Sequence, residues 1–253
     1  VTAMSWGIAR GPAILTLAGR EEALAFVIGA VLTLLACVVL QLGRPQEPPP
    51  EPAPKESPFR YLRLAPVAVA AAALNAGLES AGLSLLPLYA IQLGWSEQSA
   101  TILLTILLLG SIVLQLPIGW LSDKMSRHRL VLILAVLSAA GAFVWPAALA
   151  MEGLAYALLF VWGGAFVGIY TTMLAILGDR YQGAELVGVY ALLSIAWGLG
   201  ALVGPVLAGL AMEVSPHGLP VFAGAACALF ALAAGFHRGG MRRNDTHAQG
   251  SVH

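Results

Sequence analysis

Residues 98–122 read QSATILLTILLLGSIVLQLPIGWLS, a stretch without a formal charge. A helix needs about 20 apolar residues to cross the roughly 30 Å hydrocarbon core of a bilayer, so this stretch predicts a membrane-spanning helix. The same character recurs in residues 23–43, 64–92, 130–151, 153–178, 186–212 and 218–236. Together these stretches contain one formally charged residue, Glu79. The repetition predicts an all-α polytopic membrane protein.

The composition supports this class and excludes others. Of the 253 residues, 59% are hydrophobic and 10% are charged, whereas a soluble domain is about 25% charged. The formal net charge of zero gives no case for a nucleic-acid partner. No cysteine or histidine pattern has zinc spacing. No HExxH, GxSxG or phosphate-loop pattern occurs. We therefore expect no enzyme, no cofactor and no metal site.

Two segments interrupt the series of spans. Residues 44–60, RPQEPPPEPAPKESPFR, are rich in proline and mixed in charge, which favours an extended, solvated linker. Residues 1–18 are apolar but contain Arg10 and a Gly-Pro pair. They are interpreted as the rear part of a helix, in either a truncated chain or one with an alternative start codon.

Basic residues alternate along the chain in a way that predicts the topology. All of them except Arg10 and Arg20 lie in residues 44–63, 123–129, 180 and 238–253. Glu97, Glu152 and Glu213 lie in the intervening loops. Because short cytoplasmic loops carry an excess of Lys and Arg, we expect the linker, the 123–129 loop and the C-terminus to be cytoplasmic, in a plasma (inner) membrane.

One loop has an ordered motif. Residues 119–129 read GWLSDKMSRHR, which resembles the G-x-L-A-D-R-x-G-R-R loop of the major facilitator superfamily. The matching residues are Gly119, Leu121, Asp123, Lys124 and Arg127, and the departures are Ser122, Ser126 and His128.

A second motif agrees with the first. The pattern Gly200-xxx-Gly204-Pro205-xxx-Gly209 resembles the Gly-Pro helix motif of that family, and Arg10-Gly11-Pro12 resembles its counterpart in the first half. The resemblance covers nearly the whole chain. It implies helices 5 to 12 of a twelve-helix transporter, with helices 1 to 4 supplied by a longer chain or by a partner. Residues 1–43 would be the last two helices of the first half, 44–63 the linker, 64–237 a six-helix bundle and 238–253 a tail.

Glu79 is the first candidate functional residue. A charged side chain at the centre of a bilayer costs about 2.5–3.5 kcal/mol on insertion scales, and such residues commonly serve function. Apolar surroundings favour the neutral acid, so an acid that changes its surroundings could carry a proton. Asn75 lies four residues earlier, on the same helical face, and could hydrogen-bond either form. A protonated acid that only bonds a neighbouring helix is the structural alternative.

The remaining candidates fall into three groups. The resemblance implies that Asp123, Lys124 and Arg127 hold the two halves together in one state, with Asp179 and Arg180 at the next junction as partners; solvated loop charges are the alternative. Tyr170, Thr171, Thr172 and Trp197 are candidates for the substrate cavity, or ordinary packing residues, while Gln115 lies too near the cytoplasmic end for this role. Gly200, Gly204, Pro205 and Gly209, with Gly164 and Gly168, have spacings that allow close helix contact.

The sequence therefore favours a secondary active transporter that exports a small organic solute by alternating access, coupled to protons. Its expected partners are the solute, protons and the lipid bilayer. A membrane scaffold or receptor without transport is the alternative, and Glu79 discriminates between the two because a scaffold gains nothing from a buried acid.

Overall fold

A computed structural model describes residues 30–31, 33–39, 41 and 61–250. Residues 30–31, 33–39 and 41 are helical. Residues 1–18, with Arg10-Gly11-Pro12, and the linker 44–60 lie outside the described residues. The described part contains helices and no strand, so the prediction of an all-α polytopic membrane protein is confirmed.

The helices follow one another in the order predicted from the apolar stretches. Their bounds are α3 Tyr61–Leu64, α4 Pro66–Gln92, α5 Glu97–Val113, α6 Gln115–Lys124, α7 Arg127–Ala148, α8 Glu152–Arg180, α9 Gly183–Val214 and α10 Gly218–Gly250. With α5 and α6 taken as one span, the described residues contain six segments long and apolar enough to cross a membrane. Large apolar side chains remain exposed on their outer faces, for example Leu116 at 81% and Leu202 at 69%, as expected for a surface in contact with lipid.

The predicted span 98–122 consists of two consecutive helices that meet at Leu114. Pro117 lies one turn after Val113 and has no N–H, so it removes a helical hydrogen bond and its ring crowds the preceding turn. The amide of Gln115 adds a side-chain bond beside the break, because its Nε2 donates to the carbonyl oxygen of Ser111 at 2.8 Å. The break thus has a local chemical cause.

The last helix is longer than its apolar part. The apolar stretch ends at residue 236, and α10 continues as a helix as far as Gly250, through most of the predicted tail 238–253. No proline follows Pro220 in the sequence to end the helix.

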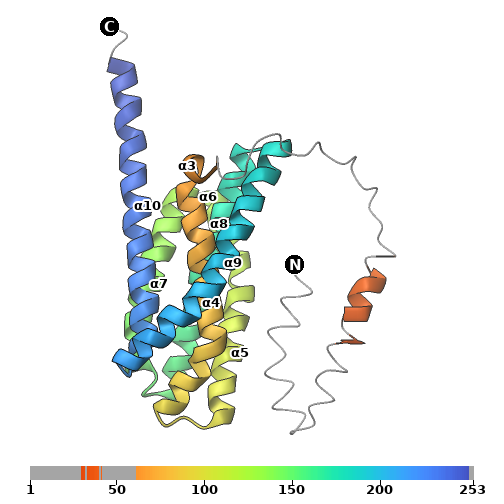
Figure 1. The fold of residues 1–253 in the computed structure, drawn as a ribbon, viewed down its shortest axis with the longest axis vertical. Coiled ribbons are helices and arrows are strands. Elements are labelled where there is room, and N and C mark those ends of the chain that lie inside the picture. Colours follow the sequence, from red (N-terminus) through yellow and green to blue (C-terminus); the bar gives the residue numbers. More distant parts are fainter. Residues whose placement is uncertain (1–29, 32, 40, 42–60, 251–253) are drawn as a thin grey trace.

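The long helices run alternately up and down between two ends of the bundle (Figure 1). One end gathers Lys124, Arg127, Arg129 and Arg180, and we call it the basic end. The C-terminal end of α10 and α3 lie on this side. The opposite end carries the loops 93–96, 149–151 and 215–217.

Two hydrogen bonds fasten the three described loops of the opposite end. Trp95 Nε1 donates to the carbonyl oxygen of Leu149 at 3.0 Å, which joins the loop after α4 to the loop after α7. The Tyr89 hydroxyl lies 2.9 Å from His217 Nδ1, which joins α4 to the loop before α10. Each of the three loops described at this end is therefore held to another part of the bundle.

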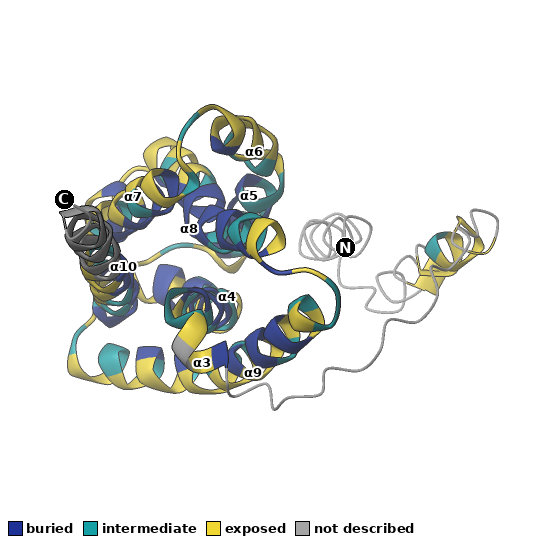
Figure 2. Cartoon of the chain, turned by 90° about the horizontal axis from the view of Figure 1, so that it is seen from above, coloured by how far each residue is buried: buried dark blue, intermediate teal, exposed yellow. Residues whose placement is uncertain are grey.

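Glycines set the closest helix contacts. A Cβ at Gly200 would lie 2.2 Å from the Ala73 carbonyl oxygen, and one at Gly204 would lie 2.4 Å from Gly77 Cα. These positions bring the backbones of α4 and α9 together, as Figure 2 shows from above. Gly209 differs, because nothing lies within 4 Å of the place its Cβ would take.

A second glycine contact joins α8 to the broken span. A Cβ at Gly164 would lie 2.4 Å from Leu114 Cβ, and one at Gly168 would lie 2.8 Å from Ile118 Cδ1. Small residues allow helices to approach closely in lipid, where no hydrophobic force drives them together. The two spacings noted in the sequence thus lie at two different interfaces, α4–α9 and α8 with α5 and α6.

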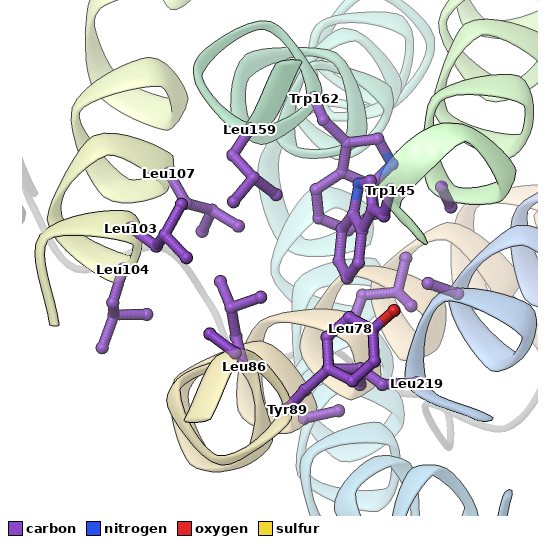
Figure 3. Close-up of a cluster of buried hydrophobic side chains, with 14 of the residues drawn as sticks. Leu78, Leu86, Tyr89, Leu103, Leu104, Leu107, Trp145, Leu159, Trp162 and Leu219 are labelled. Atoms are coloured by element: carbon purple, nitrogen blue, oxygen red, sulfur yellow. The ribbon is translucent and has the colours of Figure 1, made fainter. Parts of the chain in front are cut away.

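The core is divided along the bundle axis into two buried clusters. Figure 3 shows the cluster nearer the opposite end, which includes Leu86 and Tyr89 of α4, Trp145 of α7 and Trp162 of α8. The rings of Trp145 and Trp162 meet edge to face, with centroids 4.7 Å apart. The second cluster lies toward the basic end; its members include Tyr61, Leu130, Ile169, Met173, Tyr181 and Val189.

Candidate functional site

Arg127, the first residue of α7, is the centre of a charged cluster at the basic end. Its Nη1 donates to Asp179 Oδ2 in the last turn of α8, and also to the carbonyl oxygen of Ala175 at 3.1 Å. Its Nη2 lies 4.0 Å from Asp123 Oδ1 at the end of α6. A cation over the C-terminal turn of a helix is favourable because carbonyl groups point outward there. One guanidinium therefore joins the ends of α6 and α8 to the start of α7.

The five charged residues proposed from the sequence are not equivalent. The structure brings Arg127, Asp179 and Asp123 together. Lys124 Nζ instead lies 4.0 Å from the centroid of the Trp120 ring, and Arg180 Cζ lies 5.6 Å from that of Tyr181. Both are cation–π contacts. Among the described residues, neither Lys124 nor Arg180 forms an ion pair. Gly119 has nothing within 4 Å of the place its Cβ would take.

A cavity of about 500 Å³ opens beside this cluster. Its walls come from the end of α6, the start of α7 and the end of α8, and its lining residues are Ser122, Met125, Arg127, His128, Ile176, Asp179 and Arg180. The Ser122 hydroxyl is buried and has no hydrogen-bond partner in the described part of the chain.

Glu79 lies close to the middle of α4 and is partly buried. No ion pair or hydrogen bond joins it to the described residues. Asn75, one turn away, is 3% exposed, and its Oδ1 has no hydrogen-bond partner among the described residues. In this conformation no hydrogen bond joins the Asn75 and Glu79 side chains. An acid and an amide thus lie in the apolar span with hydrogen-bonding capacity unused.

The candidates for the substrate cavity form two contacts. The rings of Tyr170 on α8 and Trp197 on α9 are tilted by 52°, with centroids 5.0 Å apart. The Thr171 hydroxyl donates to Gln115 Oε1 at 2.8 Å and joins α8 to the start of α6. Thr172, by contrast, is 2% exposed, and its hydroxyl has no partner in the residues described. Tyr170, Thr171 and Trp197 are all partly exposed.

Gln115 lies toward the basic end, away from the bilayer centre, and its position in the sequence therefore gave no reason to place it in a substrate cavity. The structure gives it a different importance, since its amide bonds both the broken helix and Thr171. The sequence contained a signal for the helix break, because Pro117, two residues later, has no N–H.

The described residues, including the cluster at the basic end, contain no group of three or more His, Cys, Asp or Glu side chains that could hold a metal ion.

Comparison with known proteins agrees with this architecture. The family model described as Major Facilitator Superfamily matches residues 68–250. A relative from Bacillus subtilis (strain 168), "Uncharacterized MFS-type transporter YfkF", is 28% identical over 216 residues, which cover 82% of this chain and 54% of the relative. The chain thus spans about half the length of the curated relative it matches. Since the family match extends over more than half of the sequence, the chain belongs to the Major Facilitator Superfamily.

Proposed function

We propose that this chain is the C-terminal part of a proton-coupled secondary transporter that exports a small organic solute, with Glu79 as the proton carrier. The observation that carries the proposal is a single acid at the middle of a span, partly exposed and without an ion-pair partner among the described residues. A charge in the bilayer centre is costly, so a change in its surroundings changes the balance between its neutral and charged forms. That is the requirement for carrying a proton between two sides.

The solute would be a neutral organic molecule or an organic cation. The apolar spans from residue 64 to residue 236 contain no Lys or Arg, so these residues offer no side chain that would pair with a strong anion. The Tyr170 and Trp197 rings offer faces that attract cations or stack on planar molecules. Tyr170, Trp197 and Thr171 are therefore the residues proposed to contact the solute from this half of the transporter.

Transport would follow alternating access, in which two bundles rock around a site at their interface. The charged cluster of Arg127 with Asp179 and Asp123 would stabilise one state at the basic end. Exposed ion pairs contribute only about 0–1 kcal/mol each, which is small enough to form and break within one cycle. Helices 1 to 4 would come from a longer chain or a partner, and the basic end would face the cytoplasm of a plasma (inner) membrane.

The test replaces Glu79 by Gln in the full-length protein, reconstituted in vesicles with ethidium as a fluorescent organic cation. Gln keeps the size and hydrogen bonding of the side chain but cannot change charge. We expect the variant to lose ethidium movement driven by an imposed pH gradient while it keeps exchange of ethidium across the membrane. Glu97→Gln, in the first turn of α5, is the control and should retain both.

Two results would contradict the proposal. A Glu79→Gln variant that responds fully to the gradient would show that the acid does not carry the proton. Wild-type vesicles that move no organic cation or neutral dye under any gradient would favour the alternative, a membrane scaffold or receptor without transport.

A further inference from the structure

We propose that the cavity at the basic end binds the phosphate group of an anionic phospholipid, with Arg180 as its main ligand. The cavity of about 500 Å³ shares the residues His128, Ile176 and Arg180 with a smaller neighbouring cavity of about 60 Å³. A cavity with charged lining residues and a mostly apolar cavity therefore lie on either side of a common wall. A phospholipid has the same two parts, because its headgroup is charged and the beginning of its acyl chain is apolar.

Charge distribution selects Arg180 as the phosphate ligand. The charge of Arg127 is already balanced by Asp179 in direct contact and by Asp123 at 4.0 Å. Arg180 is exposed, and its contact in the described chain is with a ring rather than a carboxylate. Lys124 and Arg129 are exposed at the same end. The basic end thus retains positive charge, and it can form charge-assisted hydrogen bonds, which are the stronger class.

The apolar cavity indicates a lipid rather than free phosphate. Its walls come from the start of α4 with α3, from α7, from α8 and from α10, and they include Pro66, Val67, Val131, Met173 and Ala234. With a volume of only about 60 Å³, this cavity admits the beginning of an acyl chain and not a whole tail. The rest of the tail would lie along exposed Leu62, Leu64 and Ile133, where the bilayer surrounds the helices.

The location agrees with this occupant. Figure 2 shows α3, α10, α7 and α8 around this end of the bundle, with α6 beside α7 and α8. Anionic lipids of the cytoplasmic leaflet attract basic segments, at about 1 kcal/mol for each Lys or Arg near the surface. A fixed cavity would add selectivity to that general attraction.

The experiment measures binding of phosphatidylglycerol to the purified full-length protein in neutral detergent by native mass spectrometry. Phosphatidylcholine with the same acyl chains is the neutral comparison. We expect phosphatidylglycerol to bind more tightly, and Arg180→Gln to weaken its binding by about tenfold or more, tenfold being the lower end of the worth of a hydrogen bond to a charged group. Arg129→Gln removes an exposed charge that does not line either cavity, and it should change binding by less than about twofold.

Three outcomes would overturn the proposal. Equal binding of the two lipids would exclude selection by charge, and equal losses in the two Arg variants would reduce the effect to general attraction. Full displacement of phosphatidylglycerol by soluble glycerol phosphate would show a site for phosphate alone. The unfolding temperature of each variant without lipid is measured beside binding, and Val131→Phe, which fills the apolar cavity and keeps Arg180, should also weaken lipid binding.

Discussion

Thr171 on α8 donates a hydrogen bond of 2.8 Å to Gln115 Oε1, and the other end of the same amide donates 2.8 Å to the carbonyl of Ser111. The side chain of Gln115 therefore performs two tasks at once. It satisfies a backbone group beside the helix break at Leu114, and it fixes the direction of α6 against α8. The residues of α6 that follow lead directly to Asp123 and Arg127.

We expect Thr171→Val and Gln115→Leu to differ in severity. Thr171→Val removes one side-chain hydrogen bond, which is worth about 0.5–1.5 kcal/mol. Gln115→Leu removes the same bond and also leaves the Ser111 carbonyl without this donor. The unfolding free energy of Gln115→Leu should therefore fall further than that of Thr171→Val. Unfolding of both variants in detergent is measured by circular dichroism. Thr105→Val, whose hydroxyl bonds only its own helix at Thr101, is the control. Equal stabilities for all three variants would contradict the role of Gln115.

Asp179→Asn should slow transport more than Asp123→Asn does, while both leave solute binding largely intact. Asp179 contacts the Arg127 guanidinium directly, whereas Asp123 lies 4.0 Å away with 77% of its side chain exposed. Initial rates in vesicles and ethidium affinity in detergent separate the two effects. Loss of affinity with a normal rate would argue against a gating role for either acid.

Gly204→Ala should destabilise the bundle, and Gly209→Ala should not. A Cβ at Gly204 would meet the α4 backbone at 2.4 Å, whereas nothing lies within 4 Å of the same position at Gly209. Overpacking costs about 1–3 kcal/mol, while Ala in place of an unhindered helical Gly gains up to about 1 kcal/mol. Thermal unfolding midpoints should therefore move in opposite directions. A shared direction of change would mean that the α4–α9 contact relaxes freely.

Cysteines placed at Ser126 and Ser215 should react with an impermeant reagent from opposite sides of the membrane. Ser126 precedes α7 at the basic end, and Ser215 follows α9 at the opposite end. Ser57→Cys in the linker should behave as Ser126→Cys does. The exposed native Cys37 is replaced by Ser, and buried Cys227 is kept. Labelling of Ser126 and Ser215 from one side would disprove the topology.

The sequence predicted the spans well because charge is excluded from a bilayer, and the boundaries agree within a few residues at most ends. It did not predict which helices touch. Gly200 and Gly204 identified a contact surface, but only the fold shows that Ala73 and Gly77 face them. It also placed Gly209 in that surface, since a motif of spaced glycines does not state where the partner helix diverges. The break at Leu114 was missed because proline is tolerated in membrane helices.

For the charged cluster, too, the sequence predicted which residues lie together but not which of them form contacts. Five charged residues of one end were predicted as a group, and their types were sufficient for that. The pairing of Arg127 with Asp179 rather than Arg180 with Asp123 depends on how far α8 extends past the start of α7. The length of α8 depends on packing of the whole bundle, so it cannot be predicted from the sequence of the loop.

The fastened loops at the opposite end have a consequence for how the chain accepts insertions. Surface turns of membrane proteins usually tolerate added residues, and epitope tags are commonly placed there. Here Trp95 holds Leu149, and Tyr89 holds His217, so a tag next to any of these residues would separate groups that are bonded across the bundle. The turns at the basic end would be equally unsuitable because of the Arg127 cluster. For this chain, the end of α10 is the more suitable position for a tag.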